Sequence, residues 1–423
     1  GFSWNMDEEP WMKEISPAVS SFVWRVATGY RGNVNKTVYP QFVMNYSSTM
    51  RPLDNDNLRM GYIGNAPNPL LRWEKTWDMK FAADMGFVKE RIHLLLEFYR
   101  SLGMDLVTNE AVPYSTGFMS QAYNNSEQVN QGIEATLSTV NIKTRDFTWD
   151  MSFNVAYNYN KLTDYWPTNG SVATGSTNYE GYPLSSVMTG KVLGIDPETG
   201  MYVFKKRSDA KGDAHTLSSY RDYLFYVGTN NAPVTGGFSM GFRYKTLSVS
   251  LSGSFSFGGI VSNEIDCPVD YTTLSGTSSG SSEWLQDVPT PRNDLYVNHL
   301  NVNGDVVRRW TKDNPITDGY PKLIDHWYPR SASDGSAKAD VISEGITNAI
   351  FLEKINYVKL SSIVISYSLP EKWMKRTRLD GVNFSFTMNN LFTFTNYSGF
   401  DPETPGIVYP MTRSFSLGVG LSF

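Results

Sequence analysis

The chain closes with the stretch Ser414-Phe415-Ser416-Leu417-Gly418-Val419-Gly420-Leu421-Ser422-Phe423. Every second residue is apolar, and the residues between them are Ser or Gly. Successive side chains of a β-strand point to opposite faces, so this segment is predicted to be a strand with one apolar and one small polar face. Strands of a β-barrel that crosses a membrane have this pattern, with the apolar face in lipid and the other face toward a lumen.

The same alternation recurs along the rest of the chain. Apolar residues occupy alternate positions in the runs 22–30, 77–87, 92–98, 133–137, 147–159, 238–244, 247–257, 363–369 and 382–388. Many of these runs approach the roughly ten residues that a tilted strand needs to cross a bilayer. With the last strand and a strand tail at residues 1–4, they predict about eleven strands.

The links between the predicted strands alternate in length. Short polar turns are predicted at 89–91, 143–146, 245–246 and 370–379. Long links are predicted at 32–69, 104–128, 162–232, 260–350 and 396–410. Outer-membrane barrels have short turns on the periplasmic side and long loops outside. We therefore predict an all-β fold, a transmembrane antiparallel β-barrel, with every short turn on one side.

Composition excludes several other classes. No apolar run reaches the roughly 20 residues of a membrane-spanning helix, so a helical membrane protein is excluded. The net charge of −5 argues against a nucleic-acid partner, and the single cysteine, Cys267, allows no intrachain disulfide. A soluble β-sandwich or propeller is the structural alternative. It is disfavoured because the polar face carries mostly Ser, Thr, Asn and Gly instead of charges.

Several stretches resemble those of SusC/RagA-like TonB-dependent outer-membrane transporters. The matching stretches are Asn68-Pro69-Leu70-Leu71-Arg72-Trp73-Glu74-Lys75-Thr76, Gly181-Tyr182-Pro183-Leu184, Gly194-Ile195-Asp196-Pro197-Glu198-Thr199-Gly200, Tyr357-Val358-Lys359-Leu360-Ser361-Ser362-Ile363, Asn389-Asn390-Leu391-Phe392-Thr393-Phe394-Thr395-Asn396-Tyr397-Ser398-Gly399-Phe400-Asp401-Pro402-Glu403 and Tyr409-Pro410. They occur in the family's order. The resemblance implies that residues 1–423 are the C-terminal half of a 22-stranded barrel. It also implies that the plug domain and the N-terminal strands lie outside this chain.

The resemblance further implies a function and partners. We expect TonB-dependent import of nutrients, mostly oligosaccharides or peptides, across the outer membrane. A SusD-like lipoprotein would cover the extracellular mouth, TonB would act through the plug region, and lipid would surround the barrel. No cofactor is expected. The alternatives are a passive pore and a structural or interaction barrel.

No catalytic or metal constellation is recognised in the sequence. The four histidines, at 93, 215, 299 and 326, lack metal-binding spacing, and nothing completes a zinc set around Asp266, Cys267 and Asp270. His93 is predicted to lie in a strand and face the lumen. The stretches 196–200 and 401–403 are interpreted as turns, and the alternative is a calcium or substrate contact.

Two sets of residues are candidates for a binding or assembly role. The link 261–350 carries thirteen acidic and seven basic residues, and its rings could stack on sugars, so Trp284, Trp310 and Trp327 are predicted to contact substrate. The alternative is that these rings pack the link against itself or against the lid. The alternating residues of the last strand, Phe415, Leu417, Val419, Leu421 and Phe423, are predicted to be read by the barrel-assembly machinery; ordinary packing in lipid is compatible with that role.

Overall fold

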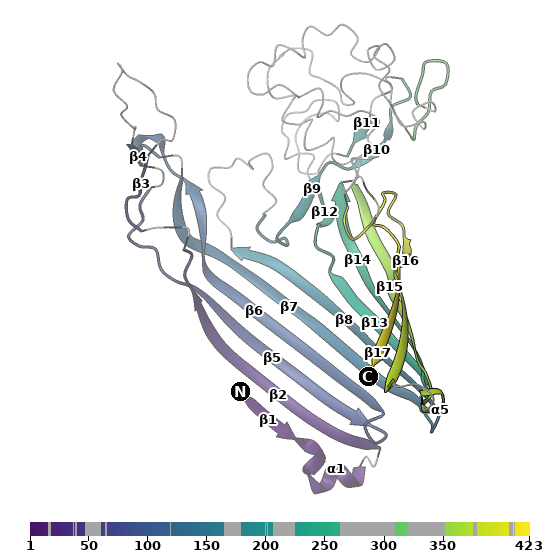
Figure 1. Cartoon of the computed structure of the whole chain (residues 1–423). Helices are drawn as coiled ribbons and strands as arrows, with labels where there is room; N and C mark the ends of the chain where they lie inside the picture. The colour runs from purple at the N-terminus through teal and green to yellow at the C-terminus, as the bar shows by residue number, and fades with distance from the viewer. Residues whose placement is uncertain are drawn as a thin grey trace, which may run out of the picture.

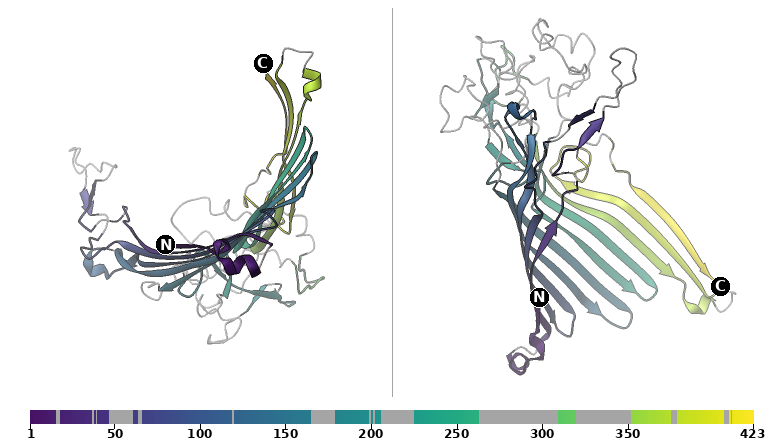
Figure 2. Two further views of the ribbon diagram at one scale, coloured as in Figure 1. Left: turned by 90° about the horizontal axis from the view of Figure 1, so that it is seen from below. Right: turned by 90° about the vertical axis from the view of Figure 1, so that its left-hand side faces the viewer.

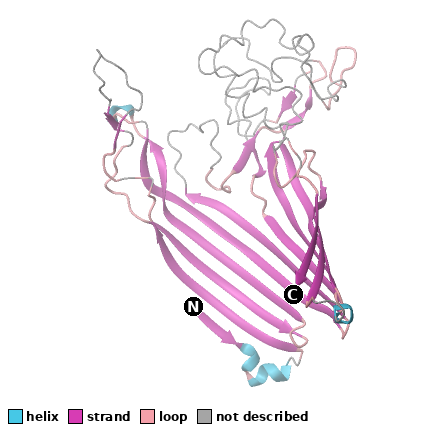
Figure 3. Cartoon of the chain, viewed as in Figure 1, coloured by secondary structure: helices cyan, strands magenta, loops and turns pink. Residues whose placement is uncertain are grey.

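A computed structural model gives the fold. It describes residues 1–15, 18–36, 38, 40–46, 61–63, 66–118, 120–164, 179–198, 200, 202–205, 225–262, 309–319, 352–374, 379–405, 409 and 411–423. Strands dominate this part of the chain, and the helices are short (Figure 3). The described residues contain no helix with the length and apolarity that a membrane span requires.

One antiparallel sheet forms the body of the molecule (Figure 1). Its main path follows chain order through β1 Phe2–Asn5, β2 Val19–Asn33, β5 Glu74–Phe87, β6 Ile92–Ala111, β7 Ser120–Lys143, β8 Phe147–Asp164, β13 Val234–Tyr244, β14 Leu247–Ser262, β15 Leu352–Ser368, β16 Gly381–Thr395 and β17 Ser414–Ser422. These are eleven strands within the described residues, and β1 is a tail of four. The sequence prediction of about eleven strands is confirmed.

Smaller elements lie at the two ends of this sheet. η1 (Met6–Glu8) and α1 (Pro10–Ile15) connect β1 to β2, and α5 (Glu371–Met374) follows β15. At the other end are η2 Tyr114–Thr116, β3 Met44–Tyr46, β4 Gly61–Ile63, β9 Ser186–Thr189, β10 Val192–Ile195, β11 Tyr202–Phe204 and β12 Phe225–Thr229 (Figure 1).

The register places like residues beside each other on each face. On one face Trp149, Met151 and Phe153 of β8 lie opposite Phe242, Met240 and Phe238 of β13. On the other face Ser248 and Ser252 of β14 lie opposite Ser366 and Ser362 of β15, and the hydroxyls of Ser252 and Ser362 are 2.8 Å apart. The alternation in the sequence therefore produces one apolar face for lipid and one polar face, which we call the lumen face.

The predicted sidedness of the turns is confirmed. The described parts of 89–91, 143–146, 245–246 and 370–379 all lie at the same end of the sheet, which is the lower end in Figure 1. Lys89, Glu90 and Lys245 have positive φ angles of 56°, 60° and 53°, as tight turns between antiparallel strands require. We assign this end to the periplasm.

The sheet is curved and open (Figure 2). β1 and β17 are its two edges, and within the described residues they are not paired with each other. This open sheet agrees with the expectation that residues 1–423 are only part of a barrel.

One predicted long link was wrong. Residues 104–128 are not a loop, because β6 continues to Ala111 and β7 begins at Ser120, which leaves a short link around η2. β6 pairs with β5 only as far as Met104, so the β6–β7 hairpin continues beyond the neighbouring strand. The links 32–69 and 162–232 are long, as predicted, and contain the short strands β3 to β4 and β9 to β12.

Candidate functional site

The lumen face differs between the two halves of the sheet. On β2, β5 and β6 it carries charged groups: Arg25 Nη2 forms an ion pair with Asp84 Oδ2 at 2.7 Å, and His93 Nε2 contacts Asp84 Oδ1 at 2.6 Å. Arg31 Nε pairs with Asp78 Oδ2 at 2.6 Å. His93 is therefore in a strand on the lumen face, as predicted, and contacts a carboxylate.

On β13 to β17 most of the lumen face is neutral. Small hydroxyl and glycine positions follow each other across the strands, and the register pairs that show this are Gly237 with Ser254, Ser239 with Ser252, Gly241 with Ser250, Ser385 with Gly418 and Thr387 with Ser416. Such a wall offers hydrogen-bond donors and acceptors without net charge. It suits contact with neutral polar solutes.

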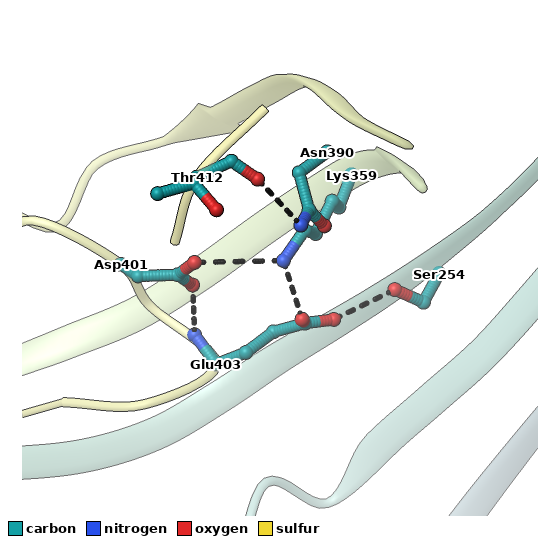
Figure 4. Close-up of polar contacts among 6 residues, drawn as sticks. All are labelled: Ser254, Lys359, Asn390, Asp401, Glu403 and Thr412. Atoms are coloured by element: carbon teal, nitrogen blue, oxygen red, sulfur yellow. Dashed lines mark hydrogen bonds and ion pairs between the residues drawn. The ribbon is translucent and has the colours of Figure 1, made fainter. Parts of the chain in front are cut away.

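One buried cation interrupts this neutral wall. Lys359 of β15 lies opposite Ser254 of β14, and its side chain is 2% exposed. Its Nζ lies 2.6 Å from Glu403 Oε2 and 3.5 Å from Asp401 Oδ2 (Figure 4). Ser254 Oγ donates to Glu403 Oε1 at 3.0 Å. A buried lysine needs such partners, because an unpaired buried charge is strongly unfavourable.

This cluster anchors the segment 396–405 between β16 and β17 on the lumen face. Glu403 reaches past β15 to Ser254 on β14 (Figure 4). The same segment is held at a second point, where the Ser398 backbone N–H donates to Glu353 Oε2 at 3.0 Å. The segment is thus bound across the wall of the lumen near the end opposite the turns.

The stretch 401–403 forms the predicted turn. The Glu403 backbone N–H donates to Asp401 Oδ1 at 2.9 Å. Because Asp401 is 7% exposed and also faces Lys359, its carboxylate is occupied by contacts within the chain. Within the described residues, no group of three or more His, Cys, Asp or Glu is arranged to hold a metal ion.

The stretch 196–200 is also a turn, and Trp310 packs on it. The Gly200 N–H donates to Asp196 O at 2.8 Å, and the Glu198 N–H donates to Asp196 Oδ1 at 2.9 Å. Trp310 is 7% exposed, and its Nε1 donates to Pro197 O at 2.9 Å. A Cβ on Gly200, which has a φ of +71°, would lie 2.4 Å from the indole ring. The ring requires glycine there.

Of the three tryptophans predicted to contact substrate, only Trp310 lies among the described residues. Trp284 and Trp327 lie outside the described residues, as do Asp266, Cys267 and Asp270. Trp310 is covered by the 196–200 turn in this conformation. Substrate contact by the three tryptophans stays a prediction.

The stretch 68–75 fastens the base of the β6–β7 hairpin. Asn68, which is 5% exposed, donates through Nδ2 to Ala122 O at 2.7 Å. Arg72 Nη2 and Lys75 Nζ lie 2.6 Å and 3.1 Å from the Asp105 carboxylate. Asp105 has a φ of +56° and lies where the pairing of β6 with β7 shifts in register. Arg72 and Lys75 therefore bind β6 at this irregular position.

The last strand, β17, pairs with β16 from Ser414 to Ser422. Its apolar residues are exposed in this chain, with Leu417 76% and Phe423 84% exposed. Their recognition during barrel assembly stays a prediction.

An antiparallel sheet with an apolar outer face, a polar lumen face and all its short turns at one end belongs to the class of transmembrane β-barrels. A family model described as TonB dependent receptor-like, beta-barrel matches residues 7–236, which is more than half of the chain. The chain therefore belongs to this family of outer-membrane receptors, whose members are transport proteins and not enzymes.

Individual relatives agree with this assignment. TonB-dependent receptor P3 of Formosa agariphila is 24% identical over all of this chain and 41% of its own length. TonB-dependent receptor SusC of Bacteroides thetaiotaomicron is 24% identical over 99% of this chain and 39% of its own length. The chain thus spans about two fifths of these relatives. The resemblance to SusC-like receptors is confirmed.

Solved structures share the fold. The structure of the RagAB peptide transporter superposes with a TM-score of 0.75 at 22% identity, covering 100% of this chain and 43% of the other. The RagAB peptide importer in its open-open state gives a TM-score of 0.74, also at 22% identity, over 100% of this chain and 42% of the other.

Proposed function

We propose that this chain forms one side of the lumen and extracellular mouth of an active nutrient importer. TonB supplies the energy through a plug region, and the substrate is an oligosaccharide or a peptide. The observation that carries the proposal is the lumen face of β13 to β17, which presents neutral hydroxyl and glycine positions. Hydroxyl-rich or amide-rich solutes can exchange hydrogen bonds along such a face without strong electrostatic trapping.

The descriptions of the related structures name the peptide class, and the oligosaccharide class is what the resemblance to SusC-like receptors implies. One relative is named SusC, and the matching RagAB structures are described as peptide transporters and importers. Between the two we favour oligosaccharides. The link 261–350 has an excess of carboxylates and holds Trp284 and Trp327 in addition to the covered Trp310, a combination that suits a neutral, hydroxyl-rich ligand better than an anionic one.

We further propose a SusD-like surface lipoprotein as a lid over the mouth. The links 162–232 and 260–350 are its proposed contacts, because they are long and rich in aromatic residues, which are enriched at protein interfaces. Purification from native membranes in mild detergent tests this proposal. A receptor that repeatedly purifies alone counts against the lid.

The test of import is uptake by cells that carry or lack the receptor. Labelled oligosaccharides and peptides of graded length are supplied, with and without an uncoupler that collapses the proton-motive force. Uptake that needs both the receptor and the proton-motive force supports active import. Uptake that needs the receptor but persists with the uncoupler supports the alternative, a passive pore.

A further inference from the structure

A notch of about 300 Å³ lies at the extracellular end of β8. There β13 begins only at Val234, and the seam between β8 and β14 is filled by residues 183–184, by β12 and by the turn after it. Its lining includes Tyr157, Tyr159, Pro183, Tyr226, Asn231 and Pro233.

The notch lies in a gap of the wall and is lined from both faces: Tyr157 and Tyr159 are on the lipid-facing side of β8, and Asn158 and Asn160 alternate with them toward the lumen face. Tyr157 lies on the same face of β8 as Phe153, because the register with β13 runs without a shift from Phe147 to Tyr157. The register with β7 extends this face to Tyr159. On that face Phe153 stacks on Phe255 of β14 at 5.4 Å between ring centres. The lipid-facing rings of the notch therefore lie beyond the stacked Phe153 and Phe255, toward the extracellular end, where the aromatic residues of barrels meet the headgroups.

The rings of the notch are accessible and close together. Tyr157, Tyr159 and Tyr226 are 47%, 40% and 41% exposed. Tyr226 also contacts the ring of Tyr182, with 5.0 Å between the ring centres. Burial raises the pKa of the Tyr226 phenol, so its hydroxyl stays neutral at physiological pH.

Some polar groups of the notch have hydrogen-bond partners within the chain, and others are available to a ligand. Thr229 Oγ1 donates to Ser185 O at 3.3 Å, and Asn160 Oδ1 accepts from the Leu184 N–H at 2.7 Å. By contrast, the side chains of Tyr157, Tyr159, Tyr226 and Asn231 make no hydrogen bond within the described part of the chain. The described lining also contains no charged residue.

This chemistry selects among headgroups. A phosphate would require cations, which the lining lacks, and an acyl chain would leave the phenol and amide groups without partners. A sugar ring has C–H faces that stack on aromatic rings and hydroxyls that bond to phenols and amides. The volume is at the lower end of the range for small-molecule pockets, which fits one or two sugar rings.

We propose that the notch binds a sugar ring of a glycolipid in the outer leaflet of the membrane. A lipid-linked sugar fits because Tyr157 and Tyr159 of the notch are on the bilayer face of β8, whereas a solute in transit would travel along the lumen face. The proposal is independent of the proposed import activity. It gives the receptor a fixed lipid contact at the seam where β13 does not extend.

Binding of rough lipopolysaccharide to the purified receptor tests the proposal. The receptor is purified from its native membrane in lauryldimethylamine oxide, which carries no sugar. Tyr159→Ala and Tyr226→Ala are compared with Tyr114→Ala, which removes an 83% exposed ring in η2 outside the notch. Each notch variant is expected to weaken lipopolysaccharide binding about fivefold, since one ring contact contributes on the order of 1 kcal/mol. The control variant should bind like the parent.

Two further probes separate the sources of binding. Phosphatidylethanolamine, which has no sugar, should bind equally to parent and variants, and free glucose should not displace lipopolysaccharide. Unchanged lipopolysaccharide binding by both folded alanine variants overturns the proposal. The proposal also fails if the variants bind phosphatidylethanolamine less tightly by the same factor as lipopolysaccharide. Displacement by free glucose overturns the lipid source. If the alanine variants do not assemble, the double variant Tyr159→Phe, Tyr226→Phe is measured instead. Lipopolysaccharide binding as tight as that of the parent then refutes the role of the phenol hydroxyls.

Discussion

Replacing Lys359 by Met should free the segment 396–405 from the lumen wall. Met has a similar length and removes the charge, so Asp401 and Glu403 lose their cation while the shape of the site is largely kept. The side chains of Asp401 and Glu403 are 8% and 29% exposed, so water can restore only part of the lost interaction.

The expected magnitude follows from this burial. Removing one partner of a buried ion pair costs about 3–5 kcal/mol, and the partial exposure of Glu403 favours the lower end. A loss of about 3 kcal/mol corresponds to a roughly 100-fold increase in local opening of the segment. Global unfolding should change less, because the strand ladders of β14 to β17 stay intact.

Hydrogen exchange followed by mass spectrometry measures this opening directly. Peptides covering 396–405 should exchange about 100-fold faster in Lys359→Met at equal temperature and pH. Lys354→Met is the matched control, because Lys354 is an exposed lysine on the same strand, and its side chain makes no ion pair or hydrogen bond within the described residues. It should change exchange less than twofold by the usual size of surface effects.

A double variant separates the ion pair from general damage. Adding Glu403→Gln to Lys359→Met removes one of the two uncompensated carboxylates, so part of the lost protection should return. Exchange in Lys359→Met equal to that of the parent would falsify the anchoring role of Lys359. Equal acceleration by Lys354→Met would show that any change on this strand loosens the segment.

Three other outcomes are expected. Asn68→Ala should make the stretch 66–75 more sensitive to limited proteolysis, because the carbonyl of the buried Ala122 loses its donor at a cost of about 1–3 kcal/mol. An unchanged cleavage pattern contradicts this role of Asn68. With Cys267 replaced by Ser, a membrane-impermeant thiol reagent added to whole cells should label Tyr114→Cys and not Glu90→Cys, and the reverse result would invert the topology. Phe423→Ala should lower the yield of heat-modifiable barrel in the outer membrane, and normal yield would dismiss its role in assembly.

The membrane-spanning part of the sheet could be predicted from the sequence because lipid imposes a strict period of two. The runs around Phe153 and Leu417 keep that period, and the structure pairs them as expected. The β6–β7 hairpin beyond Met104 escaped prediction for the same reason. Both faces of residues 105–111 and 120–128 are largely polar, so no alternation marks them as strands. Asn68 and Arg72 hold them through contacts from a distant stretch.

The lumen cluster could not be predicted from a single sequence. Lys359 contacts Asp401 and Glu403, which are 42 and 44 residues away in the sequence. Patterns of neighbouring residues do not predict contacts between residues so far apart in the chain. The available signal was a lysine at a lumen-facing position of a strand, between Tyr357 and Ser361, which implies an acidic partner. Trp310 was interpreted from the composition of its link as a ring that stacks on sugars. That interpretation did not anticipate that the 196–200 turn covers the ring.

The anchoring of 396–405 also affects the entropy of ligand capture. A mobile segment at a mouth must be ordered when a solute binds, and each side chain that is immobilised reduces affinity. Here the tethers at Ser398, Asp401 and Glu403 already restrict the backbone before any solute arrives. A solute that contacts this segment meets a preorganised surface, so even a few weak hydrogen bonds can contribute nearly their full strength to its retention.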